Sequence, residues 1–255
     1  MTSGFRLQAS GSRLPAPGSR PPLVLVPGID GTGLTFHRQV PLLARRYAVT
    51  TARLRDQADR MEDLVADLHA MVDNAAPDGA PVTLLGESFG GALTLSYALA
   101  HPERVSRLVI LNSFAHFDSP RRLWLAYQLA RAAPWGLMPA ARRLSAWRLH
   151  SPHTGPEEIR HFHQLMRETT RHGYIARLRI LRSYDVRDRL GSIAAPVLYL
   201  ASERDNLVPS IQHAQLMKSL TPHSTVRLLE GHGHICLIAP NLDLSVILDE
   251  WTGGA

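Results

Sequence analysis

Short, uninterrupted apolar runs separated by helical patterns constrain the fold of this chain most. Six such runs occupy residues 23–26, 47–52, 82–85, 108–111, 197–200 and 225–229. Strands that are apolar on consecutive residues are typical of a parallel sheet that is buried on both faces. Between two of the runs, Met61, Leu64 and Leu68 recur at helical spacing and mark one face of a helix. This alternation predicts an α/β fold, in which a mostly parallel sheet is flanked by helices.

One long segment interrupts the alternation. About 85 residues separate the run that ends at Leu111 from the run that begins at Val197, and most of them have a helical pattern punctuated by prolines. We expect this segment to form a helical cap over the C-terminal edge of the sheet. The predicted organisation is a flexible arm or edge strand at 1–22, a core at 23–117 and 191–255, and the cap at 118–190.

The composition excludes several classes of protein. With 255 residues, of which 45% are hydrophobic and 20% charged, the chain is neither disordered nor collagen-like. No apolar run approaches the ~20 residues that span a bilayer, so we expect no integral membrane segment. The first 22 residues lack the apolar core of a secretory signal, and Cys236 is the single cysteine, which excludes an internal disulfide. We therefore expect a cytoplasmic protein.

The net charge of +6 comes from one segment. Between Asp118 and Arg189 there are 14 arginines and 6 acidic residues, whereas the rest of the chain holds 14 basic and 16 acidic residues. Such a segment is either a solvated helical surface or a surface that attracts an anionic partner. Because it lacks the interleaved basic and aromatic residues of a nucleic-acid module, we expect no nucleic-acid partner.

The strongest local signal is the pentapeptide Gly86-Glu87-Ser88-Phe89-Gly90. It follows an apolar run and precedes the helix-forming residues 92–100, which is the strand–turn–helix context of a nucleophile elbow. A sharp turn of this kind holds the serine in a strained conformation with its Oγ exposed, and the glycines allow close approach of strand and helix. We predict that Ser88 is a nucleophile. The alternative is a tight turn with an incidental serine.

A serine hydroxyl needs a base to accept its proton. We predict that the base is His234, which precedes the apolar residues 235–239 where we expect the final helix to open, and His232 is the alternative. The base needs a carboxylate that orients its ring. Asp205, just past the strand at 197–200, is the predicted acid, with Glu203 as the alternative.

An oxyanion hole needs two backbone N–H groups. We predict that they come from Phe89, directly after the nucleophile, and from Ile29 in the glycine-rich loop 27–33, with Asp30 as the alternative to Ile29. The glycines of this loop run in the reverse order of the dinucleotide fingerprint, and the loop lacks the Gly-Lys ending of a P-loop. We therefore expect no nucleotide cofactor. His232 and His234 have no third ligand at a recognisable spacing, so we expect no metal site.

These motifs together resemble the α/β-hydrolase superfamily. The pentapeptide, the acid segment 203–209 and the terminal Gly233-His234 match it in order and spacing, and the resemblance extends from Pro22 to the C-terminus. Loop 27–33 looks like that of the esterase, lipase and thioesterase group that includes plastid phytyl-ester-forming acyltransferases. The resemblance implies acyl transfer to water, or sometimes to an alcohol, without a dissociable cofactor.

The predicted function is a serine hydrolase that cleaves small-molecule carboxylic esters through an acyl-enzyme. The candidate substrate-binding residues are Asp30, Phe114, Trp124 and Trp135, although the aromatic residues could instead pack the cap onto the core. Cap arginines such as Arg142 and Arg143 could bind an acidic partner, which leaves a thioesterase acting on an acyl carrier protein or a coenzyme A thioester as one alternative. An acyltransferase to an alcohol is the other.

Overall fold

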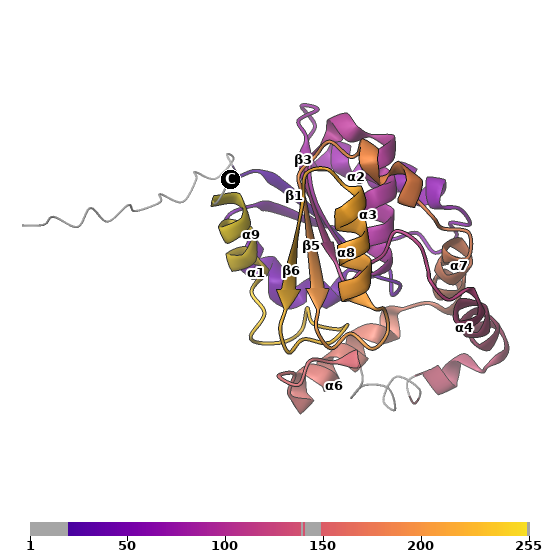
Figure 1. Cartoon of the computed structure of the whole chain (residues 1–255). Coiled ribbons are helices and arrows are strands. Elements are labelled where there is room, and N and C mark those ends of the chain that lie inside the picture. The colour runs from indigo at the N-terminus through magenta and orange to yellow at the C-terminus, as the bar shows by residue number, and fades with distance from the viewer. Residues whose placement is uncertain (1–19, 139, 141–148, 254–255) are drawn as a thin grey trace, which may run out of the picture.

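Six parallel strands form one sheet at the centre of the molecule (Figure 1). The computed structural model describes residues 20–138, 140 and 149–253. The strands are β1 (Pro22–Val26), β2 (Ala48–Thr51), β3 (Val82–Glu87), β4 (Val105–Leu111), β5 (Val197–Ser202) and β6 (Ser224–Leu229). They lie in the order β2-β1-β3-β4-β5-β6, and every neighbouring pair is parallel. The predicted parallel α/β fold is confirmed.

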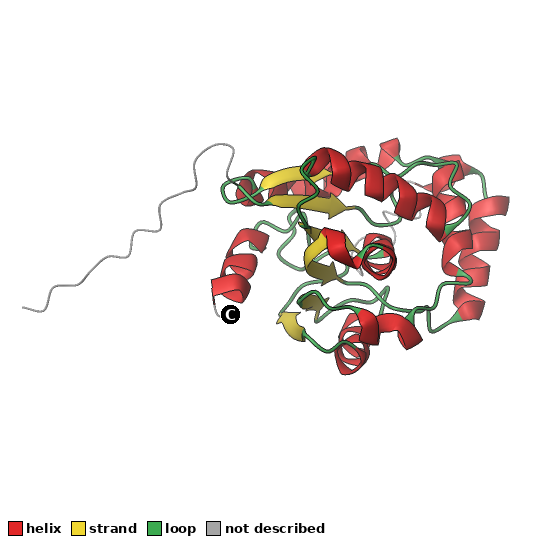
Figure 2. Cartoon of the chain, turned by 90° about the horizontal axis from the view of Figure 1, so that it is seen from above, coloured by secondary structure: helices red, strands yellow, loops and turns green. Residues whose placement is uncertain are grey.

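The sheet is covered by helices on both faces, which explains the uninterrupted apolar runs (Figure 2). On one face, α2 (Met61–Ala75), α3 (Phe89–Ala100) and α8 (Ser210–Leu220) pack against side chains such as Val24 and Leu84. On the other face, α1 (Gln39–Leu43) and α9 (Leu244–Gly253) pack against the alternate positions, such as Leu25 and Leu85. The core is therefore two apolar layers, one on each side of the sheet.

The described residues between β4 and β5 are largely helical, and we call residues 112–196 the helical insertion. It contains α4 (Pro120–Ala132), α6 (Pro156–Leu165) and α7 (Arg171–Leu181), together with the short turns η3 (Trp135–Leu137), η4 (Met166–Glu168) and η5 (Arg187–Ser192). Its described residues form isolated bridges but no strand. The arrowheads of β5 and β6 point toward the side where α6 lies (Figure 1). The helix α6 of the insertion thus lies at the C-terminal ends of the strands.

The final helix begins later than the sequence pattern predicts. Residues 235–243 form turns, and α9 starts only at Leu244. The Gln39 amide donates to the carbonyls of Leu237 (3.1 Å) and Leu242 (3.0 Å) and accepts from the Leu244 N–H (3.0 Å). The prediction of a helix that opens at residue 235 was wrong because a side chain about 200 residues away in sequence satisfies the backbone of these turns.

Two sequence predictions concern segments that lie outside the described residues. Most of the arm at 1–22 belongs to the undescribed range 1–19, and Arg142 and Arg143 lie in the range 141–148. Across the part of the chain that the structure describes, every helix is too short or too polar to cross a membrane.

Candidate active site

Ser88 occupies a sharp turn between β3 and α3. Its backbone has φ 53° and ψ −118°, a conformation that non-glycine residues rarely adopt. The flanking glycines leave the space that this turn requires. A Cβ atom on Gly90 would lie 2.2 Å from the Val26 carbonyl oxygen, and one on Gly86 would lie 2.4 Å from the Gly90 carbonyl oxygen. The predicted strand–turn–helix geometry is therefore present, and it directs residue 88 toward the C-terminal edge of the sheet.

Three side chains from distant parts of the chain meet at this edge. The Nε2 atom of His234 lies 3.2 Å from the Ser88 Oγ, and its Nδ1 atom lies 2.7 Å from the Asp205 Oδ2. Asp205 follows β5 and His234 follows β6, so parallel strands bring the three residues to one edge. Ser88 and His234 are both buried. The structure thus places the three residues predicted from the sequence in one continuous chain of hydrogen bonds.

Asp205 is held as an ionised acceptor. The backbone N–H groups of Leu207 and Val208 each donate to its Oδ1 at 2.9 Å, and the Ser210 hydroxyl donates to its Oδ2. Burial by itself would raise the pKa of Asp205, but the charge and hydrogen bond of His234 and these further donors hold the pKa below its usual value. An ionised carboxylate can only accept, so His234 donates from Nδ1, and in the neutral imidazole this leaves Nε2 to accept a hydrogen bond from the Ser88 hydroxyl.

The two alternative residues have other partners. His232 Nδ1 is bonded to the Ser151 hydroxyl at 3.0 Å, and the His232 carbonyl accepts from the Arg204 N–H at 2.8 Å. Glu203 accepts from the Gly231 N–H at 2.8 Å. These contacts hold the loop that carries His234. Neither alternative residue takes part in the chain of hydrogen bonds at Ser88.

The loop after β1 lies beside the nucleophile, with Ile29 in the wall of the same cavity as Ser88. The loop is braced internally, because the Gly31 N–H donates to the Gly28 carbonyl (3.0 Å) and Asp30 accepts from the Thr32 N–H (2.9 Å). Phe89, on the opposite side, is the first residue of α3, and N–H groups of a first turn have no partner within their own helix. Both predicted oxyanion donors therefore belong to elements at the nucleophile.

Arg177, a buried residue of another element, holds the same loop in place. The sequence analysis did not identify it. Its guanidinium donates to the carbonyls of Ile29 (3.2 Å) and Asp30 (3.4 Å), and it pairs with Asp56 at 2.9 Å. The side chain belongs to α7 and is only 1% exposed. A Cβ atom on Gly31, whose φ is +72°, would lie 2.2 Å from the guanidinium. In the sequence, Arg177 looks like one of many arginines on a solvated helix.

Glu87 is a second residue that the sequence analysis passed over. Its Oε1 lies 3.8 Å from the His234 Nε2, and its carboxyl group accepts a hydrogen bond from the Gly28 backbone. Burial raises the pKa of Glu87 to about 7, and the nearby charges of Asp30 and Asp205 act in the same direction. Burial would lower the pKa of His234, but Asp205 and then Glu87 outweigh it and raise that pKa above its ordinary value.

A largely apolar cavity of about 360 Å³ opens onto Ser88 and His234. Its apolar wall includes Leu149, Phe162, Met166, Tyr174, Leu207 and Leu237. Much of this wall comes from the helical insertion, and the carboxyl groups of Asp30 and Glu87 are among its polar groups. The arrangement places the Ser88 hydroxyl in the wall of a pocket that suits an apolar group.

Of the four candidate substrate-binding residues, Asp30 lines this cavity and the three aromatic residues are not among the described residues of its wall. Phe114 packs edge-on against Phe117 at a centroid distance of 5.4 Å. Trp124 is 50% exposed on α4. The ring of Trp135 packs against the ring of Tyr174, which lines the cavity, at a centroid distance of 5.8 Å.

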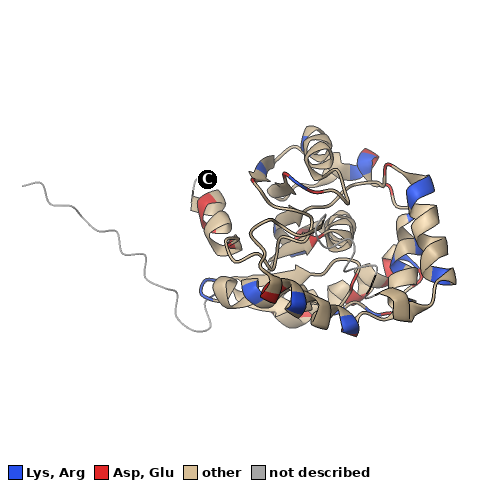
Figure 3. Cartoon of the chain, turned by 90° about the horizontal axis from the view of Figure 1, so that it is seen from below, with Lys and Arg blue, Asp and Glu red and all other residues tan. Residues whose placement is uncertain are grey.

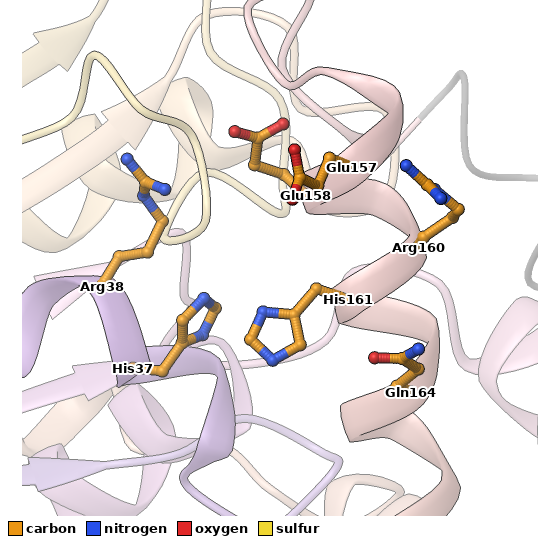
Figure 4. A pocket seen from close by; sticks show the side chains of 7 residues that line it. All are labelled: His37, Arg38, Glu157, Glu158, Arg160, His161 and Gln164. Atoms are coloured by element: carbon orange, nitrogen blue, oxygen red, sulfur yellow. The ribbon is translucent and has the colours of Figure 1, made fainter.

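A polar pocket of about 380 Å³ lies between η1 (Leu34–Arg38) and α6. Figure 4 shows His37 and His161 pointing toward each other across it, with ring centroids 4.5 Å apart. Arg38 and Arg160 line it together with Glu157 and Glu158. The described residues of its wall include no serine or cysteine, so among them there is no counterpart of the Ser88 hydroxyl.

One cluster among the described residues could hold a metal ion. His116, Asp118 and His213 offer ligand atoms that lie within 4.8 Å of one another. The two imidazole Nε2 atoms lie 2.5 Å and 3.0 Å from the two oxygens of the Asp118 carboxylate. The Asp118 carboxylate therefore has two imidazole partners without an ion.

Comparisons with known proteins agree with this architecture. The chain is 28% identical over 258 residues to RutD of Serratia proteamaculans, which bears the name of a carbamate hydrolase, and the match covers 91% of this chain and 90% of that protein. It is 24% identical over 256 residues to phytyl ester synthase 1 of Arabidopsis thaliana, which covers 89% of this chain but 36% of that longer protein.

Solved structures share the fold. A hydrolase from Pseudomonas aeruginosa superposes with a TM-score of 0.81 at 22% identity, over 94% of this chain and 93% of that one. An esterase from Exiguobacterium antarcticum superposes with a TM-score of 0.76 at 20% identity, over 93% and 92%. The family model of the alpha/beta hydrolase fold matches residues 21–239. The chain therefore belongs to the α/β-hydrolase fold family.

Proposed function

We propose that Ser88, His234 and Asp205 form the catalytic triad of a carboxylic ester hydrolase. The supporting observation is the unbroken hydrogen-bond chain from the Asp205 carboxylate through the imidazole to a serine in a strained turn. Asp205 sets the tautomer in which His234 can accept a proton from Ser88. Named hydrolases and esterases among the relatives agree with this assignment.

The reaction has two halves. The Ser88 Oγ attacks the ester carbonyl carbon while His234 Nε2 takes its proton, and the carbonyl oxygen becomes an oxyanion that accepts from the N–H groups of Phe89 and Ile29. The C–O bond to the leaving alcohol breaks as His234 returns the proton to that oxygen, which leaves an acyl-enzyme. Water then attacks the acyl carbon, His234 again takes and returns a proton, and the acid and free Ser88 result.

The cavity favours a neutral ester with an apolar acyl group. Among the described residues of its wall are the carboxyl groups of Asp30 and Glu87 and no arginine. A coenzyme A thioester or an acyl carrier protein would bring anionic groups toward these carboxyl groups, so we do not include either in the proposal.

Acyl transfer to an alcohol would use the same acyl-enzyme and is distinguished by its product. We propose a cytoplasmic location, with which a single buried free thiol, that of Cys236, is compatible.

Carbamate cleavage is a second candidate. The relative named as a carbamate hydrolase matches nine-tenths of both chains. A carbamate carbonyl can be attacked by the same serine, with an amine or an alcohol as the leaving group. A panel of p-nitrophenyl esters with increasing acyl length, alongside p-nitrophenyl carbamates, separates the two candidates by kcat/KM.

The decisive variant is Ser88→Ala. We expect it to lower kcat for p-nitrophenyl esters by at least ~10³-fold and to abolish labelling by a fluorophosphonate, because both need the nucleophilic hydroxyl. Ser219→Ala removes an exposed hydroxyl on α8 and should behave as the wild type. Wild-type turnover in Ser88→Ala would refute the proposal.

A further inference from the structure

Exposed apolar side chains are concentrated on one part of the helical insertion. Among the described residues, eight large apolar side chains are exposed, and four of them are Trp124 (50%), Leu125 (52%), Leu129 (57%) and Leu137 (59%). The first three belong to α4, and the fourth ends η3, which follows it. The other four are scattered over separate elements. Neighbouring exposed apolar groups of this size mark an interaction surface.

The three side chains on α4 share one face. At 100° per residue, Trp124, Leu125 and Leu129 lie within an arc of about 140°, and Arg121 falls between them. Leu123 and Ala130 point the opposite way and are buried. We call Arg121, Arg122, Trp124, Leu125 and Leu129 the outer face of α4. Figure 1 shows α4 at the edge of the molecule, and the exposed side chains show that this face is turned toward solvent.

The charge on this helix has one sign. α4 contains Arg121, Arg122 and Arg131 and no acidic residue. Neither Arg121 nor Arg122 forms an ion pair with any described residue. Figure 3 shows basic residues on the helices at the right-hand edge, where α4 and α7 lie. The outer face is therefore both apolar and cationic.

This combination fits an anionic lipid surface. Tryptophan resides at the boundary between headgroups and acyl chains, leucines enter the apolar layer, and arginines bind lipid phosphates. A helix face turned toward solvent presents these groups together to a flat layer. We propose that the outer face of α4, extended by Leu137, docks this protein on anionic lipid surfaces.

Docking would bring the catalytic cavity to the lipid. η3 is followed directly by Met138, which lines the cavity, and α4 packs on α7, which contributes Tyr174 to the same wall. An apolar ester dissolved in the lipid could then reach Ser88 without crossing much water. This delivery of substrate rests on the proposed ester hydrolysis, whereas the docking itself does not.

The test is sedimentation of the full chain with lipid vesicles. We expect at least ~10-fold tighter binding to phosphatidylcholine vesicles that contain about one third phosphatidylglycerol than to pure phosphatidylcholine, and weaker binding as salt rises. The combined variant Trp124→Ser, Leu125→Ser, Leu129→Ser should lose at least ~10-fold of this affinity, because the apolar insertion is removed. Arg121→Gln with Arg122→Gln should lose most of the preference for phosphatidylglycerol.

The matched control is Leu220→Ser with Val246→Ser, which removes two exposed apolar side chains from other elements (37% and 49%) and should bind vesicles as the wild type does. The triple-serine variant should turn over a short, water-soluble ester at the wild-type rate. Absence of binding by the wild type, or equal loss in the control, overturns the proposal. The proposal is also overturned if analytical ultracentrifugation without lipid shows a dimer that the triple-serine variant no longer forms. A wild type that binds vesicles but cleaves no ester would refute the proposed function alone.

Discussion

In the proposed mechanism, one buried carboxyl group, that of Glu87, contributes to the pH at which the site works. It lies 3.8 Å from the base, and its charge is one of the influences that raise the pKa of His234. His234 must be neutral to accept the Ser88 proton, so a raised pKa moves the acidic limb of the activity profile upward. We therefore expect kcat/KM of the wild type to fall as the pH drops, with an apparent pKa above the ordinary value of histidine.

The variant Glu87→Gln tests this influence on activity. Wherever Glu87 is ionised, loss of its negative charge removes a stabilising partner of the imidazolium, so the pKa of His234 falls and the acidic limb of kcat/KM moves to lower pH. Because the pKa of Glu87 is itself about 7, Glu87 is only partly ionised over this limb and the shift is partial. The measurement is kcat/KM between about pH 5 and 9 for a neutral ester. Glu157→Gln, which changes an exposed carboxylate on α6, should leave the profile in place. An unmoved acidic limb in Glu87→Gln would exclude this electrostatic role.

At the scale of elements, the crossing of β1, β3 and α3 leaves no room for a side chain at the elbow. A Cβ atom on Gly90 would lie 2.2 Å from one backbone oxygen and 2.5 Å from another, and backbone cannot yield as a flexible side chain does. A Cβ atom on Gly136, in η3, would have no neighbouring atom within 4 Å. Substitution by alanine at these two glycines therefore makes a matched comparison, in which the added methyl group is crowded at Gly90 and free of contacts at Gly136.

We expect Gly90→Ala to lower the free energy of unfolding by about 2–4 kcal/mol and to lower kcat, because the strand and helix must separate at Ser88. Gly136→Ala should change the free energy of unfolding by less than ~1 kcal/mol in either direction. Urea unfolding followed by circular dichroism measures both. Similar effects in the two variants would show that crowding at the elbow does not matter.

The helical insertion is connected to the loop after β1 through one buried side chain. Arg177 of α7 holds the carbonyls of Ile29 and Asp30, so removal of its guanidinium should let this loop move relative to Ser88. We expect Arg177→Met to lower kcat by about 10- to 100-fold with little change in the KM of a short ester, because the residue does not line the cavity.

The control is Arg179→Met on the same helix, which breaks an exposed ion pair with Asp59 and should lower kcat less than ~2-fold. Steady-state kinetics on both variants, together with their melting temperatures, separate a misplaced loop from a general loss of stability. An equal loss of kcat in the two variants would contradict the role given to Arg177.

At the scale of the whole molecule, Glu87 makes stability depend on pH. Its pKa is raised from 4.5 to about 7 in the folded protein, so the folded state keeps a proton that the unfolded chain releases. This contribution to stability is complete below the unfolded pKa and is lost as the pH rises through the folded pKa. Relative to Glu87→Gln, the wild type should therefore lose about 3 kcal/mol of unfolding free energy between pH 4.5 and pH 8.

Urea unfolding of both proteins at several pH values checks this difference. A gap between wild type and Glu87→Gln that stays constant with pH would show that Glu87 is not protonated preferentially in the folded state.

The amino-acid sequence by itself determined the strands, their burial on both faces of a parallel sheet, and the three side chains that lie together at the sheet edge, those of Ser88, Asp205 and His234. These signals are local, because uninterrupted apolar runs report burial on both faces and the pentapeptide reports a sharp turn. Only the tertiary structure decided where α9 begins, and that Arg177 is buried while Trp124 is exposed. Each of these depends on contacts between residues far apart in the chain, and no local pattern encodes which distant carbonyl, carboxylate or solvent a side chain will meet.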